Sequence, residues 1–372
     1  MIQRFFCTIP NVSNAYEIEI GRGILNSQIK YLSNLASRFA IITDDIVAPL
    51  YGKKLEKLLS SSGLKVNLFS FPSGEQHKTR TTKELLENNL FEKGFGRDSC
   101  VIALGGGVVT DIAGYLAATY CRGIPLVMIP TSLLGMVDAS IGGKTGVNVS
   151  YGKNLLGCIY HPKKVVIDIL TLKSLPKYEF ANGVVEMIKH GLVADHHLFE
   201  YLENNALQLL ALDLDVVEKA IFESCRIKKE IVEQDERERG KRHLLNFGHT
   251  IGHALENLTH YTLSHGEAVA IGLLVESYLS LKLKVLDSES FERIKRILIQ
   301  YDLPLKLPFQ FPISRILEAM AFDKKSIKGQ ARFVTIEKIG SPQITDSSYC
   351  VHVEEILVKE ALQWMNDDLY SY

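Results

Sequence analysis

The stretch CVIALGGGVVTDIAGYLAAT, residues 100–119, joins a short apolar run to three glycines and then to a second apolar run. We expect residues 100–104 to form a buried β-strand and residues 108–120 to form a helix. The glycines at 105–107 then stand at the turn from strand to helix, where backbone N–H groups can approach a phosphate group closely. The stretch predicts a nucleotide-binding turn, with a tight turn that binds no ligand as the alternative.

Short β-branched runs alternate with helical patterns on both sides of this stretch. Strands are predicted over residues 39–43, 66–71 and 126–130, and helices over residues 47–61 and 81–93. Such alternation is typical of a parallel sheet covered by helices, so the first half should be an α/β nucleotide-binding domain. The segment after residue 130 is expected to be rich in loops.

The pattern changes near residue 178 to long amphipathic stretches. Helices are predicted over residues 178–205, 215–236, 242–260, 266–283 and 288–301. The second half should therefore be an all-α domain, with a small hairpin or an edge strand at residues 331–338. Proline disfavours helix in the residue before it and suits the first turn of the next helix, so the boundary is placed at residues 170–176. The predicted domains are residues 1–175 and 176–372.

The composition argues against several classes of protein. The 372 residues include 42 Lys and Arg against 43 Asp and Glu, which leaves no bulk positive charge for nucleic acid or an anionic membrane. The apolar stretch 101–119 is interrupted by glycines and by Asp111, so no membrane span is expected. No secretory signal is visible, and six scattered cysteines without a CxxC pair indicate reduced thiols in the cytoplasm.

An acidic residue follows the first predicted strand. Asp44 comes directly after the run FAIIT at residues 39–43. A carboxylate in this position can accept hydrogen bonds from ribose hydroxyls, as in dinucleotide-binding folds. An aspartate that closes a turn or caps a helix is the alternative.

A group of histidines in the second half is typical of a metal site. His249 and His253 are four residues apart and would share one face of a helix. His265 begins the next predicted helix, and Glu186 lies among apolar neighbours, where an unpaired carboxylate would be costly. Two histidines and one glutamate, with an open fourth position, are the ligands of many catalytic zinc sites. A pair of histidines with only a structural or surface role is the alternative.

Basic residues lie beside glycines and beside the candidate metal ligands. Lys144, Lys153 and Asn154 belong to glycine-rich segments, and Lys189 is one helical turn after Glu186. Lysines in such loops can meet a phosphate group as point charges, although each of them could also be a solvated surface residue. The charged run 235–242 is expected to be a solvated helix end and loop.

Ten short motifs, taken together and in order, resemble the 3-dehydroquinate synthase family of sugar-phosphate cyclases. They are GEQHK at 74–78, GGGVVTD at 105–111, YCRG at 120–123, PTSLL at 130–134, VDASIGGKT at 137–145, GKN at 152–154, EMIK at 186–189, DER at 235–237, NFGHTIGH at 246–253 and HGE at 265–267. The resemblance implies an N-terminal NAD-binding domain and a C-terminal metal-binding helical domain.

The resemblance also implies a role for individual residues. The expected NAD contacts are Asp44, Ser73, Gly74, Glu75, Gln76, His77, Lys78, Gly106, Gly107, Val108, Val109, Thr110, Asp111, Thr131, Ser132, Lys144, Lys153, Thr171, Leu172, Lys173 and Ser174. The expected ligands of zinc or cobalt are Glu186, His249 and His265, which makes His253 an active-site group that faces the substrate. The other expected catalytic residues are Asp138, Lys144, Asn154, Lys189 and Arg122. The expected substrate contacts are Lys228, Arg242, Asn246 and one of the two lysines Lys324 and Lys325.

The family reaction converts 3-deoxy-D-arabino-heptulosonate 7-phosphate, a phosphorylated sugar acid, into 3-dehydroquinate and phosphate with transient use of NAD. In this family Arg122 would come from a second subunit, so a homodimer is expected. His77, Thr110, Ser132 and Ser73 depart from the usual family residues, and we expect His77 and Thr110 to alter NAD affinity. The alternatives are a related sugar-phosphate cyclase, a metal-dependent polyol dehydrogenase, or an inactive NAD-binding scaffold protein.

Overall fold

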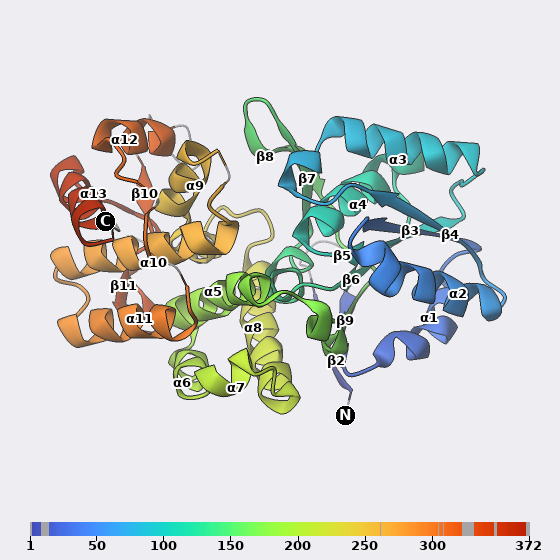
Figure 1. Cartoon of the computed structure of the whole chain (residues 1–372), viewed down its shortest axis with the longest axis horizontal. Helices are drawn as coiled ribbons and strands as arrows, with labels where there is room; N and C mark the ends of the chain where they lie inside the picture. Colours follow the sequence, from blue (N-terminus) through green and yellow to red (C-terminus); the bar gives the residue numbers. More distant parts are fainter. Residues whose placement is uncertain are drawn as a thin grey trace. The chain divides into compact units, whose positions relative to one another are not determined.

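The computed structural model describes residues 2–8, 15–260, 262–303, 305–307, 309–321, 331–345 and 348–369. The chain divides into two compact units, which are treated separately below. The N-terminal unit contains Met1–Pro176 together with Lys228–Glu233, and the C-terminal unit contains Lys177–Ile227 and Gln234–Tyr372. Figure 1 shows the course of the chain through its helices and strands.

A seven-stranded sheet forms the centre of the N-terminal unit. The strand order is β1-β2-β9-β6-β5-β3-β4, and all neighbours are parallel except β1 and β2. The strands are β1 (Gln3–Cys7), β2 (Tyr16–Gly21), β3 (Arg38–Asp44), β4 (Lys65–Phe71), β5 (Ser99–Gly105), β6 (Leu126–Pro130) and β9 (Lys164–Asp168). The predicted parallel α/β architecture is confirmed, although β1, β2 and β9 were not among the predicted strands.

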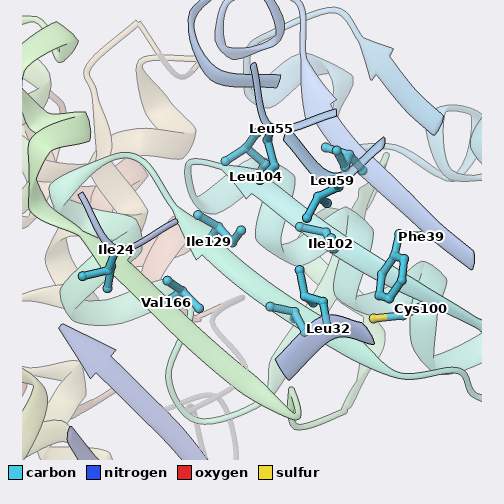
Figure 2. Close-up of a cluster of buried hydrophobic side chains, with 12 residues drawn as sticks. Ile24, Leu32, Phe39, Leu55, Leu59, Cys100, Ile102, Leu104, Ile129 and Val166 are labelled. Atoms are coloured by element: carbon cyan, nitrogen blue, oxygen red, sulfur yellow. The ribbon is translucent and has the colours of Figure 1, made fainter. Parts of the chain in front are cut away.

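Apolar side chains of strands and helices form the core of this unit. Its helices are α1 (Ile29–Ser33), α2 (Lys53–Ser61), α3 (Arg80–Glu92) and α4 (Gly107–Thr119). Figure 2 shows Leu55 and Leu59 of α2 beside Ile102 and Leu104 of β5. Every residue of β5 and β6 is buried, which explains why these strands are continuous apolar runs rather than alternating ones.

The segment predicted to be rich in loops begins with turns and one short helical turn at residues 131–143, but it continues as a β-hairpin. Strand β7 (Lys144–Val149) pairs with β8 (Gly152–Ile159) in antiparallel fashion. A Cβ atom at Gly157 would collide with the carbonyl oxygen of Thr145, and one at Gly114 of α4 would collide with the Thr145 side chain. The prediction was wrong because these glycines permit close packing of the hairpin rather than irregular backbone.

The C-terminal unit is rich in helices, as predicted. It contains α5 (Lys177–Ala194), α6 (His196–Asn204), α7 (Ala206–Leu210), most of α8 (Leu214–Gln234), α9 (His249–Leu258), α10 (His265–Lys282), α11 (Ser288–Gln300), α12 (Ile313–Ala321) and α13 (Glu355–Asp368). Two pairs of short strands accompany them: β10 (Arg332–Phe333) with β13 (Val351–His352), and β11 (Ile336–Lys338) with β12 (Ser341–Pro342). The second pair confirms the hairpin expected near residues 331–338.

Two of the predicted helices are interrupted. The predicted helix 178–205 divides at Asp195, whose carboxylate accepts a hydrogen bond from the backbone N–H of His197 and caps α6. The predicted helix 242–260 is a 3-10 turn at Lys241–Asn246 followed by α9. Gly248 separates the two with a φ of 78°, a left-handed conformation that glycine adopts without a Cβ penalty. Among the helices in the described ranges, none has the length and apolar character to span a bilayer.

Helices α9 and α10 pack backbone against backbone at Gly272. A Cβ atom at this position would collide with the carbonyl oxygen of Gly248. We therefore expect Gly272→Ala to destabilise the protein by about 3 kcal/mol, although alanine is the better helix former. The matched control is Ala270→Gly on the same buried helix, for which a loss of about 1 kcal/mol is expected from helix propensity. Urea unfolding measures both, and equal losses would contradict the close crossing.

Candidate active site

Three side chains from three helices converge in the C-terminal unit. Glu186 lies on α5, His249 begins α9 and His265 begins α10. Atom Oε1 of Glu186 is 3.6 Å from Nε2 of His249 and 3.8 Å from Nε2 of His265. Glu186 is only 1% exposed, and its Oε1 has no hydrogen-bond partner among the residues that the structure describes. A buried carboxylate oxygen that faces two imidazole nitrogens could hold a divalent metal ion.

In both imidazole rings, the hydrogen-bond acceptor beside Nδ1 favours a proton on that nitrogen, so that Nε2 carries the lone pair that can bind a metal. Nδ1 of His249 is 3.1 Å from the carbonyl oxygen of Phe247, which can only accept a hydrogen bond. Nδ1 of His265 is 3.4 Å from Oε2 of Glu256, a carboxylate that is itself buried. Both rings can therefore carry the proton on Nδ1 and direct the Nε2 lone pair toward Glu186. These residues fit a metal ion.

His253 lies beside the ligand group but not opposite Glu186. Its ring centroid is 5.2 Å from that of His249 and 6.3 Å from that of His265. It can be grouped with Glu256 and His265, but it belongs to neither of the two candidate ligand groups that contain Glu186 among the described residues. The two histidines on one face of α9 are therefore not equivalent, and the role of His253 stays a prediction.

Three residues predicted to act on the substrate lie in the same unit, and one of them contacts a candidate metal ligand. The ammonium group of Lys189 contacts Oε2 of Glu186, and the side chains of both residues are almost completely buried. Arg242 is 2% exposed and donates a hydrogen bond from Nη1 to the carbonyl oxygen of Glu236. The amide of Asn246 donates to Oε1 of Glu238 at 2.5 Å. Buried cations and an amide beside a metal site are suited to an anionic, hydroxylated substrate.

The charged run 235–242 is an organised loop rather than a fully solvated one. The carboxylate of Asp235 accepts hydrogen bonds from the backbone N–H groups of Arg239, Gly240 and Arg242. Burial would raise the pKa of Asp235, but these three donors outweigh it and hold the pKa below its usual value. Arg237 and Arg239 are exposed, as expected for solvated residues, whereas Arg242 points into the unit.

In the N-terminal unit, predicted NAD contacts lie at one edge of the sheet. The glycine turn follows β5, Thr131 and Ser132 follow β6, Asp44 ends β3, and residues 171–174 follow β9. Because β9, β6, β5 and β3 are parallel neighbours in that order, their carboxyl ends meet at the same edge. Ligands of open α/β sheets bind at this edge.

The glycine turn leaves its backbone accessible. Gly106 precedes α4 without a side-chain cap, and a Cβ atom there would lie 3.2 Å from Oγ of Ser132. The backbone N–H of Thr131 donates to the carbonyl oxygen of Gly105 at 3.0 Å, which ties the two strand ends together. Val109 and Thr110 are buried, and the Thr110 hydroxyl donates to the carbonyl oxygen of Gly107. A cofactor contact with Val109 or Thr110 would therefore use the backbone.

Predicted NAD contacts in the segment 75–78 touch both α4 and the hairpin. The ammonium group of Lys78, which is buried, contacts Oδ2 of Asp111. Burial raises the pKa of Asp111, although Lys78 acts in the opposite direction. Asn148 donates to Oε1 of Glu75 at 2.8 Å, and Nζ of Lys153 is 4.0 Å from the same oxygen. Asn148 was missed by the sequence analysis, because only the hairpin pairing brings it to Glu75.

The remaining predicted residues have varied surroundings. Asp44 accepts hydrogen bonds from the backbone N–H groups of Ile46 and Val47 through Oδ1, as a turn aspartate does, and burial raises its pKa. Lys228, in the part of α8 that belongs to the N-terminal unit, is 2.5 Å from Oδ1 of Asp138. Arg122 is exposed and has a positive φ. Lys324 and Lys325 lie outside the described residues.

The chain matches known proteins over most of its length. Models of the 3-dehydroquinate synthase N-terminal and C-terminal regions match residues 68–182 and 183–326. The 3-dehydroquinate synthase of Desulforamulus reducens is 43% identical over 335 residues, which are 89% of this chain and 93% of that protein. That of Syntrophotalea carbinolica is 41% identical over 352 residues, 94% of this chain and 96% of that protein.

Two solved structures share the fold over almost the whole chain. A 2-deoxy-scyllo-inosose synthase in complex with carbaglucose-6-phosphate, NAD+ and Co2+ has a TM-score of 0.89 at 23% identity, and covers 97% of this chain and 99% of its own. A 2-epi-5-epi-valiolone synthase from Streptomyces hygroscopicus with bound NAD+ and Zn2+ has a TM-score of 0.87 at 28% identity with the same coverage. Together with the matches along both regions of the sequence, these findings show that the chain belongs to the 3-dehydroquinate synthase family.

Proposed function

We propose that the chain is a 3-dehydroquinate synthase, which converts 3-deoxy-D-arabino-heptulosonate 7-phosphate into 3-dehydroquinate and phosphate. The observation that carries the proposal is the convergence of Glu186, His249 and His265 in a chain 43% identical to a curated 3-dehydroquinate synthase. An inactive NAD-binding scaffold would have no use for a buried carboxylate oxygen that faces two imidazole nitrogens.

Glu186, His249 and His265 would hold zinc or cobalt, the ions bound in the two similar structures. The metal supplies Lewis acidity and orients the substrate. Lys189 neutralises the second oxygen of Glu186, so the carboxylate stays in place before any ion arrives. The remaining coordination positions are open to a hydroxylated substrate.

NAD would bind along the carboxyl edge of the N-terminal sheet, where it supplies reversible hydride acceptance. The glycine turn offers backbone N–H groups at the start of α4 to the pyrophosphate. Lys78 and Asp111 hold the segment 73–78 against α4. Asp44 uses Oδ1 for its own turn, and Oδ2 is the oxygen that we assign to the ribose.

The substrate is bound mainly by charge. Lys144, Lys189, Lys228 and Arg242 would each supply positive charge for the phosphate or the carboxylate. Glu186 holds Lys189, Asp138 holds Lys228, and the Asp235 loop holds the backbone of Arg242. Asn154 and Asn246 offer amide groups to substrate hydroxyls. His253 would relay protons through a hydroxyl group or a water molecule.

A homodimer is part of this proposal. Arg122 follows the carboxyl end of α4, whereas the glycine turn precedes its amino end, and 13 helical residues separate the two. A helix of this length is about 20 Å long, which is beyond the reach of an arginine side chain, so a second subunit would supply the residue. We also place the enzyme in the cytoplasm, because its six cysteines are scattered along the sequence without a CxxC pair, as in proteins of a reducing compartment.

The test is an assay with the heptulosonate phosphate, a trace of NAD+ and zinc, in which phosphate and dehydroquinate are both measured. We expect turnover that greatly exceeds the NAD+ supplied and that stops after a chelator removes the metal. A polyol dehydrogenase would instead accumulate NADH in proportion to product. Release of no phosphate by protein that has bound NAD and metal would exclude the synthase and favour a related sugar-phosphate cyclase.

A further inference from the structure

Glu276 of α10 is a completely buried carboxylate beside the start of α9. Its exposed fraction is 0%. Atom Oε2 accepts a hydrogen bond from the backbone N–H of Gly248 at 2.9 Å, and Oε1 accepts one from the N–H of Ile251 at 3.4 Å. Gly248 directly precedes α9 and Ile251 lies in its first turn, so a side chain of α10 caps α9.

The capping position of α9 cannot supply this contact itself. Gly248 occupies it, has no side chain and adopts a left-handed φ of 78°. The first N–H groups of a helix have no partner within the helix and need an acceptor when they are buried. Glu276 provides that acceptor from the neighbouring helix.

The reach of Glu276 depends on the close crossing of α9 and α10. Gly272 is one helical turn before Glu276 and so lies on the same face of α10. The absence of a side chain at Gly272 lets the backbone of α10 approach the carbonyl oxygen of Gly248. The glycine and the glutamate therefore act on the same turn of α9.

The charge of Glu276 matters for His249, the first residue of α9. A helix N-terminus carries about half a positive charge, which opposes the binding of a cation to a ligand at that end. A buried carboxylate on the same N–H groups offsets this charge, and it also fixes the turn from which the His249 side chain starts. Both effects favour a metal ion at Nε2 of His249.

We propose that Glu276 is a positioning residue for the metal site, which caps α9 and offsets its N-terminal charge so that His249 binds a divalent cation tightly. The inference rests on the metal site of the proposed function, and it adds a residue that does not touch the metal. Partners that orient metal ligands are worth about 10- to 100-fold in metal affinity.

The experiment compares Glu276→Gln with the native protein in zinc affinity, measured by competition with a chromogenic chelator in the absence of substrate. Glutamine keeps the volume and one acceptor oxygen but removes the charge. We expect zinc affinity to fall about 10-fold and the visible absorption bands of bound cobalt to shift. The matched control is Asp287→Asn, because Asp287 caps α11 in the same unit through the N–H of Ser290.

Asp287→Asn should leave zinc affinity unchanged, although it removes a charge from a helix N-terminus. Trp364, the single tryptophan of the chain, stacks on Tyr278 of α10 and reports the folding of each variant. Native affinity in Glu276→Gln, or an equal loss in the control, would overturn the inference. Native protein that binds no metal would instead overturn the proposed function.

Hydrogen exchange on the native protein keeps the inference testable even if Glu276→Gln fails to fold. The amides of Gly248 and Ile251 should be protected before metal is added, because Glu276 already accepts their hydrogen bonds. Protection of a peptide that covers residues 247–252 should change little when zinc binds. Fast exchange without metal and slow exchange with it would show that the metal, not Glu276, organises this turn.

Discussion

Replacing His249 with alanine is expected to abolish metal retention and to lower the rate of phosphate release by about 1,000-fold or more. A metal that acts as a Lewis acid contributes several kcal/mol to transition-state stabilisation, and about 4 kcal/mol corresponds to this factor. The matched variant is His253→Ala, one turn further along α9. It should keep its metal, because His253 is not in the group formed with Glu186, but should lose proton relay. Metal content after gel filtration and single-turnover phosphate release measure the two effects.

The two variants distinguish the ligand set suggested by the spacing of the histidines from the ligand set implied by the family resemblance. Spacing alone makes His249 and His253 a pair of ligands, in which case both variants would lose the metal equally. If His253→Ala kept both its metal and a normal rate of elimination, the proposed relay role of His253 would be wrong.

Replacing Lys189 with methionine is expected to destabilise the metal-free protein by about 3–5 kcal/mol, because it leaves the buried carboxylate of Glu186 without its cation. Saturating zinc should restore much of this loss, since the metal supplies positive charge at the other carboxylate oxygen. The zinc-induced gain in stability should therefore be larger in Lys189→Met than in the native protein. Urea unfolding followed by Trp364 fluorescence, with and without zinc, measures this difference.

Lys359→Met is the control for Lys189→Met. Lys359 pairs with Glu355 on α13, but both side chains are largely exposed, so its removal should change stability little. An equally small effect of Lys189→Met would mean that protonation or solvent access, rather than Lys189, compensates the charge of Glu186.

The central strands of the fold were predictable because their residues are buried on both faces. Runs such as residues 100–104 and 126–130 are apolar throughout, so the local sequence pattern was enough to predict them as strands. Strand β9 contains Val165, Val166 and Ile167, a β-branched run that is itself typical of a buried strand. The hairpin at residues 144–159 could not be predicted from local pattern, because its glycines are explained only by the close approach of its two strands to each other.

The candidate site also could be predicted only in part from local sequence pattern. Local pattern brought out His249, His253 and Glu186, but it could not show which histidine faces the carboxylate. That depends on Gly248, whose left-handed turn begins α9 at His249 rather than continuing a helix from residue 242. The sequence hints at a special role for Glu276 only because it is the single acidic residue in the interior of an apolar helix. Its partners are 25 and 28 residues away in the sequence and become evident only in three dimensions.

The discontinuous N-terminal unit has a consequence for synthesis on the ribosome. Its last segment, Lys228–Glu233, is made only after residues 177–227 have been translated. Lys228 must then return to Asp138, 90 positions earlier in the chain. Domains often fold in the order in which they are translated. The N-terminal unit, however, cannot finish folding until residues 228–233 have been synthesised. Chains halted near Pro176 should therefore be substrates for chaperones and proteases rather than finished domains.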